Sequence, residues 1–264
     1  MILLHPDLLS IDETMLESIE EDTKAIYRLL VFSDDHQSVD LLDRYHEAVH
    51  HLREVLSMKN AQQEAQSEKE AAVYLAHLKD SLAMIIGEIA GQRNLRLPVD
   101  LFRLFRAIAP EAATRHPNRY RQSLVRFGRC LAPPPEEVEG LVHQLFDALP
   151  DIAHPAVRAV YLHHELVRIH PFVDGNGRVS RMAKNWLLMF ELYPPIFIYA
   201  GADREQYIRV LEKSFLDVEA NPHTFHESTR QFFQDELLRI KASTGFLLNR
   251  MRNLPDDRFG PTQA

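Results

Sequence analysis

The chain has 264 residues, of which 45% are hydrophobic and 26% charged, and its formal net charge is -8. This length and apolar content predict a soluble globular protein with one large or two small domains. An acidic chain without a basic stripe argues against general nucleic-acid binding, although a few arginines can still form a local anion site.

The cysteine content and the first residues of the chain indicate in which cellular compartment the protein acts. The single cysteine, Cys130, cannot form an internal disulfide or a cysteine-based zinc cluster, which predicts a reducing compartment. The first residues, MILLHPDLLSIDE, lack the basic and long apolar regions of a secretory signal, and no window approaches ~18 uninterrupted apolar residues. We therefore expect a cytoplasmic protein without membrane contact. Export that needs no signal peptide is also compatible with the composition.

Most of the chain is expected to be helical, because glycine is rare, with 9 residues, and alternation of β-branched residues is scarce. The polar segment 60–70 is interpreted as a solvated helix end. In the first half of the chain, apolar residues at helical spacing predict helices at residues 11–30, 38–56, 71–90 and 99–108.

Residues 110–135 interrupt the helical pattern. Loose alternation over Ser123–Cys130, ended by prolines 133–135, predicts a short β-hairpin or an extended flap. Beyond the flap, helices are predicted at residues 136–149, 155–169, from about 178 to before Pro194, 204–220 and 223–248, followed by a polar tail.

The segment HPFVDGNGRVSR, at residues 170–181, gathers groups that suit phosphate chemistry. Its Gly-Asn-Gly run precedes a helix, where glycines let backbone N–H groups turn toward one point and the helix N-terminus attracts anions. Arg178 and Arg181 are three residues apart on one helix face, so both guanidinium groups can reach the same phosphates. The pattern predicts an anion site.

Two further residues of this segment add chemistry to the anion site. A carboxylate beside phosphates, here Asp174, is how proteins usually hold Mg²⁺. His170 has the ordinary pKa range of a group that accepts a proton near neutral pH. Together these groups predict phosphoryl or nucleotidyl transfer. Because nothing in the segment resembles a covalent nucleophile, the attacking group would come from the substrate, activated by His170.

Each of these features alone has an ordinary structural explanation, as a turn, a structural histidine or a solvated helix face. Their conjunction within one short segment favours the functional interpretation. The run His163, His164 and Glu165 suggests a metal site, but it lacks the i,i+4 spacing of helical zinc ligands. We therefore assign these three residues to core packing or to the surface.

Residues 170–181 resemble the signature of the Fic family, H-P-F-x-[DE]-G-N-G-R-x-x-R, at every position. The likeness covers roughly residues 95–240, and it includes segments similar to the family's flap, to the helix before the motif and to the segment after it. The resemblance implies an all-α fold, a helical bundle with a short β-hairpin flap next to the active site. It divides the chain into a helical N-terminal region at 1–92, a Fic domain at 93–248 and a polar tail at 249–264.

The resemblance also implies an activity, because most family members transfer AMP from ATP to Ser, Thr or Tyr hydroxyls of proteins. By position, His170 would be the general base, Asp174 would bind Mg²⁺, and Phe172 would anchor the loop in the core. The flap, Ser123–Leu131, would hold a segment of the target protein by strand-like pairing. Residues implied to bind the nucleotide are Gly175, Asn176, Gly177, Arg178, Arg181 and Tyr207, with Asn176 and the glycine amides at the α-phosphate and the arginines at the outer phosphates.

Some positions depart from the family pattern. Gln206 stands before Tyr207, where tyrosines are often paired, and Phe215 replaces a common Asn; both positions would lie near the nucleotide base. The family's inhibitory motif, [ST]-x-x-x-E-[GN], has no clear match. Its nearest counterpart is Ser18–Asp22, which we interpret as an acidic, solvated helix start, so a separate inhibitory protein is a possible partner.

Three functions are compatible with this site. The leading hypothesis is AMP transfer to a protein. Removal of AMP from the same target would use the same residues, with water as nucleophile. A non-catalytic Fic protein that only binds a nucleotide or a partner belongs to a different class, and the intact His, Asp, Asn and paired Arg argue against it.

Overall fold

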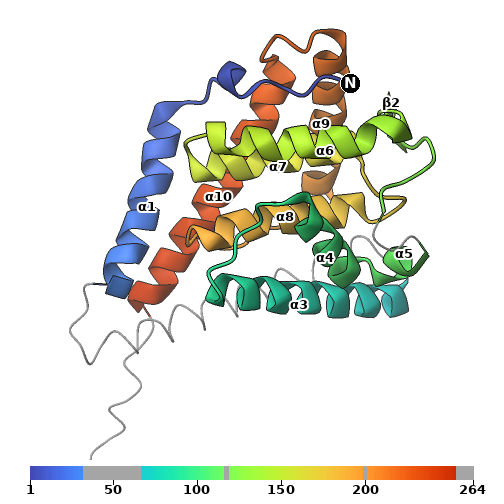
Figure 1. Ribbon diagram of the computed structural model, residues 1–264. Coiled ribbons are helices and arrows are strands. Elements are labelled where there is room, and N and C mark those ends of the chain that lie inside the picture. Colours follow the sequence, from blue (N-terminus) through green and yellow to red (C-terminus); the bar gives the residue numbers. More distant parts are fainter. Residues whose placement is uncertain (32–66, 116–118, 199–200, 254–264) are drawn as a thin grey trace, which may run out of the picture.

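A computed structural model describes residues 1–31, 67–115, 119–198 and 201–253, and it shows helices accompanied by a single two-stranded sheet in these ranges (Figure 1). The prediction of an all-α fold with a hairpin flap is therefore confirmed. The predicted helix at 38–56 lies outside the described residues. In chain order the elements are the 3₁₀ turn Pro6–Leu8, α1 (Glu13–Val31), α3 (Glu68–Ala90), α4 (Pro98–Ile108), α5 (Pro110–Arg115), β1 (Arg126–Phe127), β2 (Cys130–Leu131), α6 (Pro135–Ala148), the 3₁₀ turn Leu149–Asp151, α7 (Pro155–Ile169), α8 (Asn176–Phe190), α9 (Ala202–Ala220) and α10 (Glu227–Asn253).

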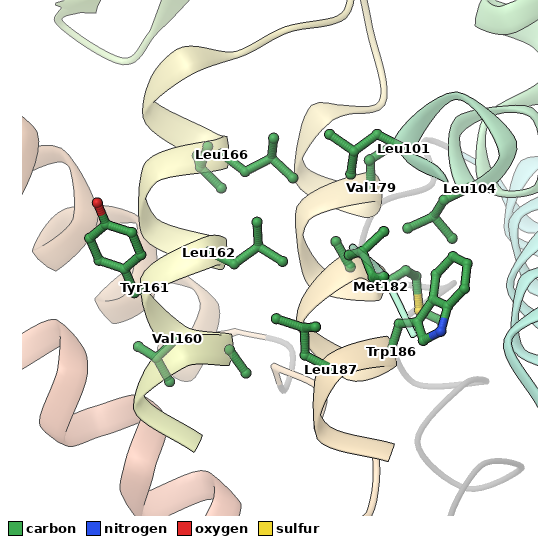
Figure 2. Close-up of a cluster of buried hydrophobic side chains, with 14 of the residues drawn as sticks. Leu101, Leu104, Val160, Tyr161, Leu162, Leu166, Val179, Met182, Trp186 and Leu187 are labelled. Atoms are coloured by element: carbon green, nitrogen blue, oxygen red, sulfur yellow. The ribbon is translucent and has the colours of Figure 1, made fainter. Parts of the chain in front are cut away.

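The centre of the molecule is the pair α7 and α8, which pack side by side (Figures 1 and 2). Helix α4 packs against α8, while α6 and α10 pack against α7. In Figure 2, Leu162 and Leu166 of α7 point toward α8, and Leu104 of α4 lies beside Trp186 on the other side of α8. Each such fully buried side chain contributes roughly 1.5–3 kcal/mol to folding. This packing makes the α7–α8 connection a rigid place for a site.

Helix α7 is buried along nearly its whole length. Its apolar side chains pack against the surrounding helices, and buried polar side chains such as Glu165 and Arg168 pair with each other. Pro155 occupies its first turn, where the missing backbone N–H costs nothing. The prediction of this helix, Pro155–Ile169, is confirmed at both ends.

The first residues of the chain pack onto the same core. Leu4 and Ile19 are fully buried in the cluster that also contains the centre of α7. The Tyr161 hydroxyl donates a 2.7 Å hydrogen bond to Leu4 O, and the Arg168 guanidinium donates one of 2.6 Å to Ile2 O. Helix α1 then runs alongside α10 (Figure 1). The N-terminal region is thus continuous with the bundle in the described ranges.

Several boundaries differ from the sequence-based expectation. Residues 110–115, expected to be non-helical, form the short helix α5, where Pro110 suits a first turn and Ala112 and Ala113 are buried. Helix α8 begins at Asn176, since Gly175 caps it with a positive φ of 75°. Helix α10 begins later than expected and continues to Asn253, into the predicted tail. No helix in the described ranges is long and apolar enough to cross a membrane.

Candidate active site

The loop between α7 and α8 is shaped by two residues in the left-handed region of backbone conformation. His170 ends α7 with φ 53° and ψ 59°, a conformation that costs a non-glycine residue roughly 1–2 kcal/mol. Gly175 precedes α8 with φ 75°, and a Cβ there would lie 2.7 Å from the Ala109 Cβ. Both the backbone angle and the lack of space therefore require glycine at 175, and the chain turns sharply enough to bring His170 next to the start of α8.

The His170 ring has a defined tautomer. Its Nδ1 lies 3.0 Å from Val167 O, and because a carbonyl can only accept, Nδ1 carries the hydrogen. Nε2 is then the lone-pair nitrogen, and it has no hydrogen-bond partner among the described residues. Burial lowers the pKa of His170 and the Arg121 charge acts in the same direction, while the hydrogen bond to Val167 O and the Asp174 charge oppose them. The ring is therefore held as a neutral base.

The loop is anchored to the core by Phe172. Its ring is fully buried and stacks on Phe105, with centroids 4.1 Å apart and planes at 12°. The Asn176 side chain braces the same residue: its Oδ1 accepts from Phe172 N at 2.8 Å, and its Nδ2 donates to Phe172 O at 2.7 Å. The predicted anchoring role of Phe172 is thus seen in the structure. The Asn176 side chain thus holds the loop.

A cavity of about 320 Å³ opens in front of this loop. It is lined by every residue that the resemblance assigned to the base, the nucleotide or Mg²⁺, and among the flap residues by Phe127. First-turn backbone amides of α8 have no intrahelical partner, so those of Asn176 and Gly177 can bind an anion here. The cavity is lined by Tyr74, Phe127, Val167, His170, Val173, Asp174, Gly175, Asn176, Gly177, Arg178, Arg181, Ile198, Arg204, Tyr207 and Ile208.

Arg178 is held from the side of α3 and α5. Its guanidinium donates to Glu111 Oε1 at 2.7 Å and to Ile108 O at 3.2 Å, and it lies 4.5 Å above the Tyr74 ring. Glu111 is 40% exposed, so this ion pair is within reach of water and its net stabilisation is small. Arg178 consequently keeps a fixed direction at the cavity wall while remaining able to bind an anion.

Arg181 is supported from beneath by a chain of buried polar groups. Its guanidinium bonds to the Tyr207 hydroxyl, which in turn lies 3.0 Å from His163 Nε2. His163 Nδ1 is 3.3 Å from a carboxylate oxygen of Glu236, outside hydrogen-bonding geometry. Tyr207, which the resemblance assigned to the nucleotide site, thus orients Arg181. A Cβ at Gly177 would lie 3.1 Å from Arg181 Nη1, so a larger residue there would crowd the guanidinium.

The far end of this chain is a buried ion cluster. Lys184 donates to Glu236, and Arg239 donates to its other oxygen at 2.9 Å. Burial works against ionisation of Glu236, but Lys184 and its other partners hold the pKa of this carboxyl far below its usual range. Glu236 is therefore a fixed negative charge under the cavity floor, provided by α10.

The His163–Glu165 run belongs to the core, as predicted. All three side chains are fully buried. His164 Nε2 lies 2.8 Å from Ser214 Oγ and its Nδ1 lies 2.7 Å from Glu165, which also pairs with Arg168. Each is engaged with protein groups, and the described residues contain no cluster of three or more His, Cys, Asp or Glu suited to a metal.

Asp174 lies exposed at the cavity rim. Its Oδ1 accepts the Gly175 N–H at 2.6 Å, which fixes the carboxylate orientation. Its other oxygen makes no hydrogen bond with the described residues. The site thus offers a single oriented carboxylate oxygen, and a hard cation here needs further oxygen ligands from a bound phosphate and water.

The hairpin flap borders the cavity through Phe127, whose ring centroid is 6.4 Å from that of His170. The two strands of the flap, β1 and β2, pair antiparallel, with Arg126 opposite Leu131 and Phe127 opposite Cys130. The tip turns at Gly128, with φ 56°, and Glu212 of α9 accepts the Arg129 N–H at 2.7 Å. The flap is thus fastened to α9 at its tip.

Sequence reasoning missed the cavity residues Tyr74, Ile198, Arg204 and Ile208, which lie outside both the flap and the segment 170–181. Arg204 was detectable in principle, since it precedes Tyr207 by one helical turn on α9. Phe215 lies beside Phe127 and His164, with ring centroids 5.4 and 5.1 Å away.

The Ser18–Asp22 segment is distant from these groups. It lies in the middle of α1, where Glu20 pairs with Lys24 at 2.7 Å and approaches His154 at 3.6 Å. None of its residues lines the cavity. This placement agrees with an acidic helix face.

The family model for the Fic/DOC family matches residues 99–188, which span α4, the flap, α6, α7 and most of α8. A protein adenylyltransferase Fic of Nematostella vectensis is 26% identical over 224 residues, 79% of this chain and 52% of that protein. One of Drosophila mojavensis is 35% identical over 117 residues, 43% of this chain and 23% of that protein. Residues 99–188 of the chain thus match the Fic/DOC family, and the chain spans about half or less of the length of these relatives.

Among solved structures, a Fic-domain-containing signalling protein of Bacteroides thetaiotaomicron superimposes with a TM-score of 0.65 at 18% identity. The match covers 91% of this chain and 99% of that one. At this identity the likeness concerns the fold, and it includes the helices outside residues 99–188.

Proposed function

We propose that this chain is a protein adenylyltransferase that moves AMP from ATP to a Ser, Thr or Tyr hydroxyl of another protein. The orientation of His170 carries the proposal: its Nδ1–H is used by Val167 O, so Nε2 is left to take a proton in a cavity that also contains three arginines. The adenylyltransferase relatives support the same activity.

In this reaction the target oxygen attacks the α-phosphorus and its proton passes to His170 Nε2. The bond from the α-phosphorus to the oxygen that bridges to the β-phosphate breaks, and pyrophosphate leaves. The amides of Asn176 and Gly177 would hold the α-phosphate at the positive end of α8, and Arg178 and Arg181 would bind the outer phosphates. Such fixed donors stabilise the charge that develops in the transition state.

Asp174 fits a Mg²⁺ ion bound together with the phosphates, because its oriented carboxylate lies exposed at the rim, next to the anion-binding amides. The ion would neutralise phosphate charge. Tyr207, through its bond to Arg181, would keep the second arginine directed at the nucleotide.

The target segment would lie along the flap, Ser123–Leu131, as an added strand. Exposed apolar side chains on the flap support this, with Leu124 62% and Leu131 49% exposed. The single cysteine, Cys130, is free and buried, which is compatible with a cytoplasmic site of action.

The test compares the wild-type chain with His170→Ala, incubated with Mg²⁺ and ATP labelled at the α-phosphate in a cell lysate. We expect labelled protein bands with the wild type and a loss of about 10²–10⁴-fold in the variant. Thermal stabilisation by Mg-ATP should be similar in both, because His170 handles the substrate proton. His143→Ala, at an exposed position on α6, is the matched control and should label normally.

The outcomes separate the competing functions. Stabilisation by Mg-ATP without any labelling would indicate a nucleotide-binding protein that does not transfer AMP. Release of AMP from bands labelled beforehand, dependent on His170, would indicate removal of the modification. Wild-type labelling by His170→Ala would contradict the assigned base.

A further inference from the structure

Arg121 lies at the base of the flap with its side chain completely buried. Its guanidinium donates to four backbone carbonyls: His170 O at 2.7 Å, Ser123 O at 2.8 Å, Pro133 O at 2.6 Å and Ile169 O at 3.3 Å. Its own backbone N–H donates to Pro171 O at 2.9 Å. One residue therefore bonds to several separate stretches of backbone.

This arrangement is unusual for a buried charge. Moving a guanidinium out of water costs several kcal/mol, and proteins normally offset that cost with a carboxylate. Among the described residues Arg121 has no ion-pair partner, and burial lowers its pKa. The four carbonyls therefore take the place of a carboxylate, because hydrogen bonds from a charged donor are stronger than those between neutral groups.

The four acceptors belong to two structural units. Ser123 and Pro133 are the two ends of the flap, on either side of β1 and β2. Ile169 and His170 are the last turn of α7 and its left-handed cap. Since His170 adopts a conformation that a non-glycine residue rarely takes, bonds to its carbonyl stabilise the turn that orients its ring.

We propose that Arg121 is a positioning residue that couples the flap to the base: the same guanidinium that closes the two ends of the flap holds the backbone of His170. A target segment that pairs with the flap then meets a base whose orientation depends on the closed flap. The catalytic consequence rests on the proposed function, whereas the mechanical coupling does not.

The test measures amide hydrogen exchange of the full chain without nucleotide. Two groups of amides report on the two units: Ala132 N–H, bonded to Val125 O, for the flap, and the N–H groups of His170 and Phe172 for the loop. Arg121→Met removes all four bonds at similar volume, and Arg121→Lys keeps the charge but reaches fewer acceptors.

Arg158→Met is the matched control. Arg158 also donates only to carbonyls, Ile152 O at 3.0 Å and Ala153 O at 3.4 Å, but at the opposite end of α7. We expect Arg121→Met to speed exchange in both reporter groups by at least about tenfold, as a loss of local stability requires. Arg121→Lys should produce a smaller change, and Arg158→Met should change neither group.

Faster exchange in the flap alone, in the loop alone, or in neither would overturn the coupling. Global unfolding of both Arg121 variants at 25 °C, with Arg158→Met folded, would also overturn it, because Arg121 would then be a residue of general stability. In the transfer assay Arg121→Met should reduce turnover at least about tenfold while the Kd for Mg-ATP stays within about twofold. A wild type without transfer activity would refute the proposed function and leave the exchange result as the test of the coupling.

Discussion

At the scale of single residues, His170 combines a fixed tautomer with an environment that favours the neutral ring. The bond from Nδ1 to Val167 O sets which nitrogen can act as base, and this follows from the structure without any ligand. The motif identified the histidine, but the last turn of α7 decides which of its two nitrogens is available.

The pH dependence of transfer follows from the pKa of His170. Burial lowers that pKa below its ordinary value of 6.5. A base must be deprotonated, so activity should be lost as the pH falls through the lowered pKa. We expect the acidic limb of the rate profile to have its midpoint below pH 6.5. A midpoint clearly above pH 6.5, measured with saturating Mg-ATP, would contradict the environment described for the ring.

Asp174 permits an isosteric test of the metal. Asp174→Asn keeps an oxygen that can accept the Gly175 N–H, so the loop turn is preserved, but it removes the negative charge. We expect Mg²⁺-dependent transfer to fall roughly a hundredfold, since a metal stabilises transition-state charge by several kcal/mol. The assay is a titration of transfer rate against Mg²⁺. An unchanged rate with unchanged sensitivity to EDTA would place the metal ligand elsewhere.

At the scale of elements, the site depends on helix ends and on the flap between α5 and α6. The cavity side chains of α3, α9 and the flap surround a loop that α7 and α8 hold from below. Helix α1, by contrast, packs on α10 and contributes no residue to the cavity lining.

The position of α1 predicts weak control by its acidic segment. Glu20 is engaged with Lys24 and His154, away from Arg181. We expect Glu20→Ala, Glu21→Ala and Asp22→Ala each to change the transfer rate by less than about tenfold, roughly 1.4 kcal/mol in barrier. Alanine is used because it preserves the helix. Much stronger activation by one of them, abolished by adding His170→Ala, would reveal an inhibitory contact of this segment.

At the scale of the whole molecule, buried ionisable groups connect the site to stability. Burial, with the nearby Lys184 charge, lowers the pKa of His163 to about 4. The ring is therefore neutral in the folded protein, while in the unfolded chain it binds a proton near pH 6.5. The unfolded state binds more protons between these values, so this contribution to stability is present above about pH 6.5 and lost as the pH falls toward about 4.

His163→Gln isolates this effect. The free energy of unfolding, measured with denaturant between pH 6.5 and pH 4, should depend less steeply on pH in the variant. The slopes of the wild type and the variant should differ by nearly one proton, which corresponds to about 1.4 kcal/mol per pH unit. His223→Gln, at an exposed position, is the control and should keep the wild-type slope. Equal slopes in all three proteins would mean that His163 is not held neutral by the fold.

Whether a structural feature can be predicted from the sequence depends on whether the interactions that form it are local or connect distant parts of the chain. Helices α3, α4, α6 and α7 were predicted within a few residues, because helical periodicity and terminal prolines are local signals. Helix α5 was missed, since Pro110–Arg115 is too short to show periodicity. The burial of Leu4 and Ile19 in the common core depends on contacts with residues far along the chain, which no local signal reveals.

The sequence by itself determined the segment 170–181, its sharp turn and its anion-binding helix start, because these features are encoded by neighbouring residues. Only the tertiary structure decided that the Asn176 side chain braces Phe172, that Tyr207 supports Arg181, and that Arg121 joins the flap to His170. The last two contacts link residues far apart in the chain, and the acceptors of Arg121 are backbone carbonyls, which every residue carries. No pattern of side chains can reveal such partners before the helices are packed.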